Sequence, residues 1–238
     1  MNPPQIDLSI IIPAYMEADR ISDVLSELAD FLHSRDYGVV EVLIVIADSP
    51  DGTAEIVRAQ AGKFEHFRII NAGPRVGKGR DVRLGIFEAT GKYRMFMDAD
   101  LATPLIHLDD VKAFMVNEGK IAIAVRDLLS IHKGLLRKTM SKAANIAAQI
   151  MVVPGIKDTQ CGFKAFTAEA AKRIFSNSII NSWGFDVETL SLARTMGYRI
   201  KEIPVRWVND EGTHVTSSAG FKFLRDVAKV RWRLWIDN

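Results

Sequence analysis

Apolar runs of strand length alternate with helical patterns along the first half of the sequence, and this alternation restricts the possible folds more than any other feature. Turn residues separate the runs, which are LSIII (8–12), EVLIVI (41–46), FRII (67–70), YRMFM (93–97) and KIAIAV (120–125). Continuous apolar strands joined by helices are typical of a mostly parallel sheet covered by helices on both faces. The sequence therefore predicts an α/β fold whose ligands bind at the carboxyl ends of the strands.

Helices are predicted between these strands and through the second half. The first has one buried face, formed by Ile21, Val24, Leu25, Leu28 and Leu32. Others are expected at residues 52–62, at 79–90, from near Pro104, at 133–151 and at 168–175. The second half also predicts a loop at 155–164, a helical stretch after 182–193 and a strand at 200–208. Because no repeat or linker divides the chain, we expect the two halves to share one core.

Composition limits the class of protein. A chain of 238 residues with 48% hydrophobic residues can bury a sizeable core. Its net charge of +2 is too small to indicate nucleic acid as a partner, and the single Cys161 suits a reducing compartment. The start of the sequence, MNPPQIDLSIIIP, has no signal-peptide pattern, and the apolar stretch at 143–155 is shorter than the roughly 20 residues that span a bilayer. We expect a cytoplasmic protein that does not cross a membrane.

Two carboxylates, Asp98 and Asp100, stand where the strand at 93–97 leaves the core. Carboxylates are costly to bury and repel each other. A divalent cation such as Mg²⁺ or Mn²⁺ removes both costs, because it takes oxygen ligands from one or two carboxylates and from substrate phosphates. The alternative is that the pair only caps the following helix. The ends of the other predicted strands decide between these interpretations.

Several other kinds of site are excluded. GPRVGKGR resembles a P-loop, but three residues separate Gly73 from Gly77 where four are required, and Lys78 precedes Gly79 in place of Ser or Thr. The histidines are scattered and no cysteines are paired, so zinc has little support. No Gly-x-Ser-x-Gly elbow is present. The acid pair remains the strongest chemical feature.

The strand ends carry, in order, IIPAYMEADRI (11–21), IADSPDGT (46–53), RVGKGRDVRLG (75–85) and the acid pair DAD (98–100). This succession resembles the family 2 glycosyltransferases of the nucleotide-diphospho-sugar (GT-A) fold, whose motifs run IPAYNE, DDGSxDGT, GKGxA…G and DAD. Later segments at 156–177, 183–190 and 201–213 look like the polyprenyl-phosphate branch, especially dolichyl-phosphate β-glucosyltransferases and dolichol-phosphate mannosyltransferases. The resemblance covers nearly the whole chain.

The resemblance implies a role for each matching residue. Pro13, Ala14, Tyr15 and Glu17 would line the nucleotide, while Asp51 would hold their loop or the nucleotide itself. Lys78 would approach the base or the phosphates. Asp98 and Asp100 would bind the donor ribose, the diphosphate and Mg²⁺ or Mn²⁺, and Asp100 is the stronger metal ligand of the two.

The second motif departs from the family pattern. Paired aspartates are usual where this chain has Ile46 and Ala47, and the side chain of Ile46 cannot accept a hydrogen bond from a base edge. Asp48, one place later, could replace the contact through a shifted loop. The mannosyltransferase relatives often carry Gln where this chain has Ala102, so a water could fill that metal position.

The acceptor site is expected in the second half. A phosphate acceptor is already anionic and needs cations, and Arg126 and Arg137 match the phosphate-binding arginines of the branch; the alternative for each is an ion pair on the protein surface. A saccharide hydroxyl would instead need a general base, for which Asp186 and Glu188 are the candidates. These two acids could also merely orient the acceptor loop.

The last segment, 219–238, predicts an amphipathic basic helix. Its apolar stripe consists of Phe223, Val227, Val230 and Leu234, and basic residues lie opposite. Such a helix could lie in a membrane interface near a lipid-linked acceptor, or pack on the domain in the ordinary way.

Together these features predict one GT-A domain at 1–218, with a donor half at about 1–104 and an acceptor half at about 105–218, followed by the helix at 219–238. The expected activity is inverting, metal-dependent transfer of a hexose from a sugar nucleotide, UDP-glucose being favoured, to a polyprenyl phosphate at the cytoplasmic membrane face. GDP-mannose is the alternative donor and a saccharide hydroxyl the alternative acceptor. A sugar-nucleotide-binding module without catalysis is the non-enzymatic alternative.

Overall fold

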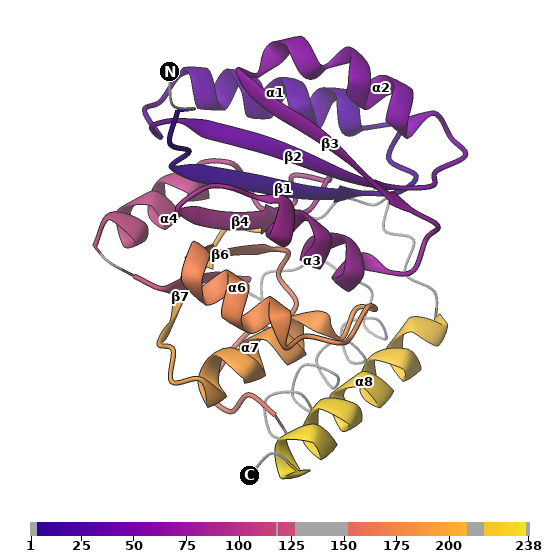
Figure 1. Cartoon of the computed structure of the whole chain (residues 1–238), viewed down its shortest axis with the longest axis vertical. Helices are drawn as coiled ribbons and strands as arrows, with labels where there is room; N and C mark the ends of the chain where they lie inside the picture. The colour runs from indigo at the N-terminus through magenta and orange to yellow at the C-terminus, as the bar shows by residue number, and fades with distance from the viewer. Residues whose placement is uncertain (1–3, 118, 127–151, 209–216, 237–238) are drawn as a thin grey trace.

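The computed structural model of the chain describes residues 4–117, 119–126, 152–208 and 217–236. A seven-stranded sheet with the order β3-β2-β1-β4-β6-β5-β7 runs through the molecule (Figure 1). The strands are β1 (Leu8–Ala14), β2 (Val40–Ala47), β3 (His66–Gly73), β4 (Tyr93–Met97), β5 (Ile121–Arg126), β6 (Phe163–Thr167) and β7 (Ile200–Val205). All neighbouring pairs are parallel except those of β6, which is antiparallel to both β4 and β5. The mostly parallel α/β sheet predicted from the sequence is confirmed.

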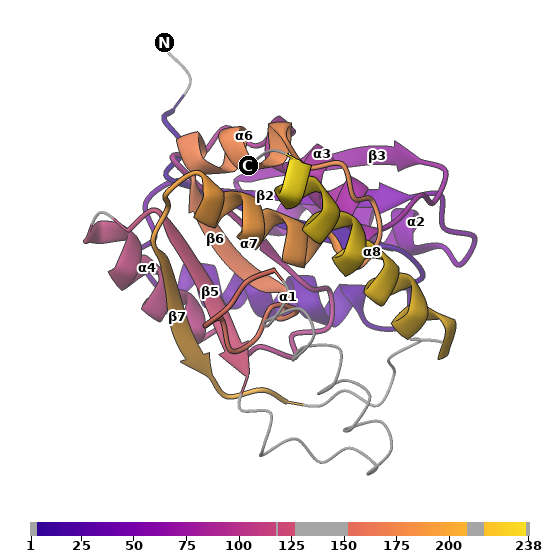
Figure 2. The ribbon, with the colours of Figure 1, turned by 90° about the horizontal axis from the view of Figure 1, so that it is seen from below.

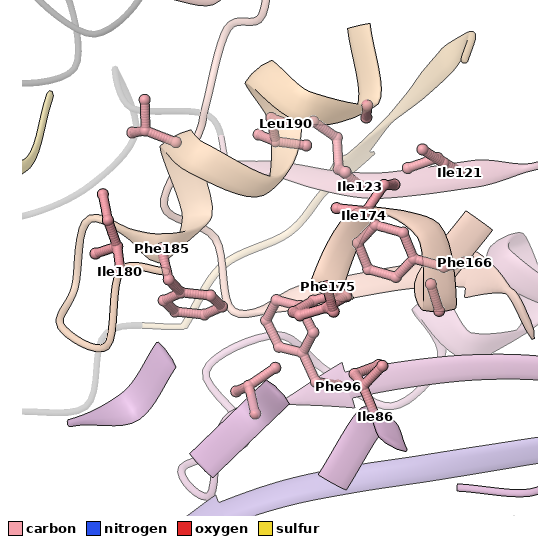
Figure 3. Close-up of a cluster of buried hydrophobic side chains, with 14 of the residues drawn as sticks. Ile86, Phe96, Ile121, Ile123, Phe166, Ile174, Phe175, Ile180, Phe185 and Leu190 are labelled. Carbon is pink, nitrogen blue, oxygen red and sulfur yellow. The ribbon is translucent and has the colours of Figure 1, made fainter. Parts of the chain in front are cut away.

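Helices cover both faces of this sheet, as the apolar strands require. One face carries α1 (Ile21–His33), α2 (Thr53–Ala59) and α4 (His107–Val116), whose buried residues join those of β1 and β2 in one cluster. The opposite face carries α3 (Lys78–Glu88), α6 (Ala168–Ser176), α7 (Phe185–Thr195) and α8 (Ser217–Ile236). Figure 3 shows the core on this second side, in which Phe96 of β4 lies among Phe166, Phe175 and Phe185.

The order of strands places the ends of β1, β2, β3 and β4 along one edge. Because these strands are parallel neighbours, the loops that follow them meet at that edge. A short 3₁₀ helix, Ala61–Lys63, connects α2 to β3. The edge formed by the strand ends is therefore where the predicted site residues of the first half come together.

The structure corrects two predictions about elements. The stretch at 155–164, predicted as loop, ends in the first residues of β6. The helix α7 begins inside the stretch at 182–193, at Phe185, and ends at Thr195, so it does not follow that stretch. The fourth helix begins at His107, in agreement with a start near Pro104. The predicted helix at 133–151 lies outside the described residues.

The apolar stripe of α8 packs against the domain. Phe223, Val227 and Val230 are buried in the core beside α7, where Figure 2 shows α8. The side chain of Leu234 is not described. The stripe itself is therefore core, as the packing alternative expects, and any membrane contact of α8 has to use its other face. Within the described part of the chain, no helix has the length and apolar character needed to span a bilayer.

This packing gives a test of stability. Phe223→Ala should lower the free energy of unfolding by about 3–5 kcal/mol, because it removes a buried ring and leaves a cavity. The matched control is Leu224→Ala on the same helix turn, whose side chain is 46% exposed, and it should cost less than about 1 kcal/mol. Urea unfolding followed by circular dichroism measures both. Equal effects of the two variants would contradict the packing described here.

Candidate active site

Asp98 and Asp100 lie directly after β4 at the carboxyl edge of the sheet, and both are partly exposed. The amide of Asp98 donates to the carbonyl of Gly162 at 3.0 Å, which ties the pair to the loop before β6. One carboxylate oxygen of Asp100 accepts the amide of Ala102 at 3.0 Å. The residue before the first turn of α4 is Ile106, and its side chain makes no capping bond. The acid pair therefore does not cap the next helix, and the capping interpretation is wrong.

Lys78, the first residue of α3, forms an ion pair with Asp98. Its Nζ atom also lies 5.1 Å from the centroid of the Trp183 ring. Loss of water alone would lower the pKa of Lys78, but the carboxylates of Asp98, Asp186 and Asp100 outweigh that loss and raise its pKa. The ammonium group is therefore charged at neutral pH and lies beside the predicted metal ligands.

The donor atoms of the acid pair fit a hard divalent cation. Burial and the neighbouring charge of Asp98 raise the pKa of Asp100. The positive charges near this carboxylate therefore do not fully stabilise its ionised form. Among the residues that the structure describes, no group of three or more His, Cys, Asp and Glu side chains is arranged to hold a metal. Mg²⁺ characteristically takes one or two carboxylates and completes its shell with water and substrate phosphates. Two carboxylates suit that arrangement and do not suit an all-protein metal cage.

Asp51 fastens the loop after β1 to the loop after β2. Its carboxylate accepts the amide of Ala18 at 3.0 Å and the hydroxyls of Ser49 and Thr53 at 2.7 Å each. These bonds outweigh the effect of burial and lower the pKa of Asp51. The hydroxyl of Ser49 in turn accepts the amide of Met16 at 2.8 Å. Asp51 thus holds the predicted nucleotide loop, as one of its two expected roles requires.

The remaining predicted nucleotide residues lie on the same edge. Burial raises the pKa of Glu17, and the charges of Asp100 and Asp98 add to this even though Arg20 donates to Glu17 at 2.5 Å. Glu17 is therefore close enough to the acid pair for their charges to interact. Pro13 and Ala14 end β1, and the ring of Tyr15 lies under the guanidinium of Arg75, 4.1 Å from ring centroid to Cζ. The arrangement brings together the predicted residues of the first two motifs.

The substituted second motif is apolar in space as well as in sequence. Ile46 is 5% exposed and Ala47 is fully buried, and the aliphatic side chain of neither can hydrogen-bond to a ligand. The pairing of β2 with β3 shifts register between these two residues. Asp48 comes next, with an exposed side chain and an amide that donates to the carbonyl of Gly73 at 2.8 Å. Its predicted contact with the nucleotide stays a prediction.

Lys164 is a site residue that sequence reasoning missed. Its ammonium group is fully buried in β6 and donates to Asp186 at 2.5 Å and to the carbonyl of Cys161 at 2.6 Å. Burial raises the pKa of Asp186 despite the two lysines, Lys164 and Lys78, that face it. Charges therefore alternate from Asp98 through Lys78 and Asp186 to Lys164. A lysine between phenylalanines in the run FKAF was the available signal, since only a buried acid makes such a position tolerable.

Glu188 holds the loop before α7 in place through hydrogen bonds. Its carboxylate accepts the hydroxyl of Ser178 at 2.6 Å and the amides of Ile179 and Ile180 at 3.0 and 2.9 Å. Arg233 of α8 approaches it at 3.4 Å and donates to the carbonyl of Asn177 at 2.7 Å. These contacts agree with the alternative in which the acids of α7 orient a loop. The general-base role of Asp186 and Glu188 stays a prediction.

Arg126, predicted to bind the acceptor phosphate, ends β5 with its guanidinium against a buried acid. The Nε and Nη2 atoms donate to Asp158 at 2.6 and 3.0 Å, and Asp158 is fully buried. The carboxylate of Asp158 outweighs the loss of water and raises the pKa of Arg126. Arg126 thus forms an ion pair, as the alternative expected, but with a buried acid and not on the protein surface. Its predicted contact with the acceptor phosphate stays a prediction. Arg137 lies outside the described residues.

Comparison with known proteins agrees with this geometry. The model of the family described as glycosyl transferase family 2 matches residues 9–175. The chain belongs to glycosyl transferase family 2. The predicted family and the enzyme class, a glycosyltransferase, are thereby confirmed.

Curated relatives extend the match to almost the whole chain. A dolichyl-phosphate beta-glucosyltransferase of Trichomonas vaginalis is 33% identical over 98% of this chain and 76% of its own length. The dolichyl-phosphate beta-glucosyltransferase of Saccharomyces cerevisiae is 31% identical over 95% of this chain and 75% of its own. The chain therefore resembles these enzymes beyond the limits of the family model.

Solved structures support the GT-A fold. Glucosyl-3-phosphoglycerate synthase from Mycobacterium tuberculosis, in complex with Mn²⁺, UDP and glucosyl-3-phosphoglycerate, superposes with a TM-score of 0.70 over 94% of this chain and 80% of that one, at 14% identity. Mannosyl-3-phosphoglycerate synthase from Rubrobacter xylanophilus also reaches 0.70, over 94% of this chain and 73% of that one, at 17% identity. At these identities the likeness concerns the fold.

The buried charges give a second test. Lys164→Met should lower the free energy of unfolding by about 3–5 kcal/mol, since it leaves Asp186 buried without its bonded partner. Lys164→Met combined with Asp186→Leu should recover much of that loss. The control Lys92→Met breaks the exposed pair between Lys92 and Asp7 and should cost at most about 1 kcal/mol. Urea unfolding of all the variants provides the comparison, and a cost for Lys164→Met no larger than for Lys92→Met would contradict the buried-pair account.

Proposed function

We propose that this glycosyltransferase transfers glucose from UDP-glucose to a dolichyl-type polyprenyl phosphate. The observation that carries the proposal is the 33% identity, over 98% of the chain, to a relative named dolichyl-phosphate beta-glucosyltransferase. The clustering of the first-half motif residues at one edge of the sheet supports it. GDP-mannose remains the alternative donor, and the UDP complexes of the fold neighbours favour UDP.

The donor would lie with its diphosphate beside the acid pair. Asp98 and Asp100 would hold Mg²⁺ or Mn²⁺, the ions present in the UDP complexes of the fold neighbours. When bound, the cation supplies charge neutralisation for the departing diphosphate. Lys78, already charged beside Asp98, is suited to bind a phosphate oxygen. The loop from Pro13 to Glu17, fastened by Asp51, would line the nucleotide.

The acceptor would attack as an anion. A phosphate oxygen of the acceptor forms a bond to the anomeric carbon while the bond from that carbon to the UDP oxygen breaks, and UDP departs with the electron pair. Attack from the opposite side inverts the configuration, in keeping with the beta linkage in the relatives' name. No proton has to be removed from a phosphate that is already ionised. The engagement of Asp186 with Lys164 and of Glu188 with the loop amides favours this acceptor over a saccharide hydroxyl, which needs a free base.

The chemistry can be tested by turnover. UDP-glucose and a short-chain dolichyl phosphate should give dolichyl phosphate glucose only with Mg²⁺ or Mn²⁺ present, and EDTA should abolish the reaction. Asp100→Asn should lower the rate by about a hundredfold or more, because a charge facing the leaving group is lost. The control Asp110→Asn alters a 55% exposed acid of α4 that pairs with His107 and should leave the rate unchanged.

Other outcomes of that assay distinguish the alternatives. Turnover only with GDP-mannose would replace the donor, and transfer to a saccharide hydroxyl would replace the acceptor. Nucleotide binding without turnover on any acceptor would support a binding module. That last outcome would contradict the proposed activity.

We also propose that the protein works at the cytoplasmic face of a membrane as a peripheral protein. The support is the outward face of α8, where the side chains of Lys222, Arg225, Lys229 and Arg231 are exposed. Trp232 and Leu224 on the same face are 64% and 46% exposed. Basic residues beside aromatic and aliphatic ones suit an anionic lipid surface.

Vesicle binding tests this surface. The protein should sediment with vesicles that contain phosphatidylserine and not with neutral vesicles, and Lys229→Glu should weaken binding several-fold. The control Lys63→Glu reverses an exposed charge on the opposite face, next to α1, and should have little effect. Equal binding to both kinds of vesicle would contradict the electrostatic contribution, and binding to neither would contradict membrane attachment through α8.

A further inference from the structure

Asp81, in the first turn of α3, is a buried acid that the proposed activity does not yet use. Its side chain is 5% exposed, and its Oδ1 atom has no hydrogen-bond partner among the described residues. Burial raises its pKa, although the positive charges of Arg80 and Arg75 oppose the rise. A carboxylate oxygen held away from water without a donor costs stability, so its presence calls for a role.

The packing of α3 locates this acid. Gly85 lies against β1 and β2 so closely that a Cβ atom there would be 2.9 Å from Cγ2 of Val45. Asp81 stands four residues before Gly85, about 6 Å along the helix, and Ala47 stands two residues beyond Val45 on the same face of β2, about 6.6 Å along the strand. The helix α3 follows β3 in the chain and precedes β4, and it crosses β2 and β1 on the way. Because β3 and β4 point in the same direction, α3 runs opposite to them. Along these axes Asp81 is therefore level with Ala47, at the carboxyl end of β2.

Compared with the family motifs, this chain has the acid and the alanine interchanged between positions 47 and 81. In the motifs that the sequence resembles, an aspartate occupies the position of Ala47 and an alanine follows GKGx, at the position of Asp81. This chain has alanine on the strand and aspartate on the facing helix turn. The acid missing from the second motif is thus supplied from α3.

The surroundings of this acid suit a flat ring that carries an N–H group. Arg75, which follows β3, reaches across the end of β2 to lie over the ring of Tyr15, which follows β1. An acceptor, a cation and an aromatic face are therefore gathered at the end of β2. Uracil offers an N–H flanked by carbonyl oxygens and an aromatic plane, which matches these groups.

We propose that Asp81 is the specificity-determining residue that accepts the hydrogen bond from the N3–H group of the nucleobase. This inference rests on the proposed function, because it assigns the base end of the same donor site. It accounts for the unpartnered Oδ1 atom and for the acid that is missing at Ala47.

The experiment compares UDP with N3-methyl-UDP, which lacks the N–H group, by calorimetric titration in the presence of Mn²⁺. The wild-type protein should bind UDP at least about tenfold more tightly than the methylated form. Asp81→Ala should abolish most of this ratio by weakening UDP. Ala47→Asp combined with Asp81→Ala should restore it, because the acid returns to the strand. The control Glu88→Ala, at the far end of α3, should leave the ratio unchanged.

Thermal unfolding separates a ligand-binding role from a structural one. Asp81→Ala should keep or raise the melting temperature, since it removes a buried carboxylate whose Oδ1 atom has no hydrogen-bond partner. An unchanged UDP ratio in Asp81→Ala would overturn the inference, as would loss of the ratio in Asp48→Ala alone. Binding of GDP and not UDP by the wild type would contradict the proposed uridine donor. In that case the role of Asp81 in base recognition would be supported if Asp81→Ala weakens GDP binding, and overturned if it does not. Binding of neither nucleotide would overturn both.

Discussion

The ion pair between Lys78 and Asp98 begins a row of charges that continues through Asp186 to Lys164 and so joins the two halves of the molecule, and the arrangement of the site depends on it. Asp98 follows β4, Lys78 begins α3, and the next charges inward, Asp186 and Lys164, belong to α7 and β6. Asp98 is tolerable at the end of a buried strand because Lys78 pairs with it, and Asp186 is tolerable because it lies between Lys78 and Lys164. Asp100 lies outside this row, and its ionised form is not fully stabilised by the cations near it. A metal ion that arrives with the donor would supply the missing positive charge.

Close backbone approaches keep this row of charges compact. A Cβ atom at Gly162 would meet the carboxylate of Asp98, and one at Gly79 would meet the side chain of Phe185 and the carbonyl of Ile180. The antiparallel strand β6 is the element that makes this possible, because it enters the sheet between β4 and β5 and carries both Gly162's loop and Lys164. The donor edge and the second half are thereby parts of one packed unit.

Sequence periodicity predicted much of this and missed particular parts for physical reasons. The first five strands are continuous apolar runs, which only a covered sheet can bury, so they were predictable. β6 was missed because Lys164 interrupts its apolar pattern, and the acid that makes it tolerable lies 22 residues away. The apolar stripe of α8 was recognised, but a stripe does not specify what covers it. The importance of Asp81 was missed because its neighbour Ala47 is close only in the folded chain.

The most direct test of the donor site is a crystal structure of the protein with UDP and Mn²⁺. The account predicts an anomalous Mn²⁺ peak between the diphosphate and the carboxylates of Asp98 and Asp100, with Lys78 bonded to a phosphate oxygen. A Mn²⁺ ion and diphosphate bound away from both carboxylates, with the pair of Lys78 and Asp98 undisturbed, would contradict it.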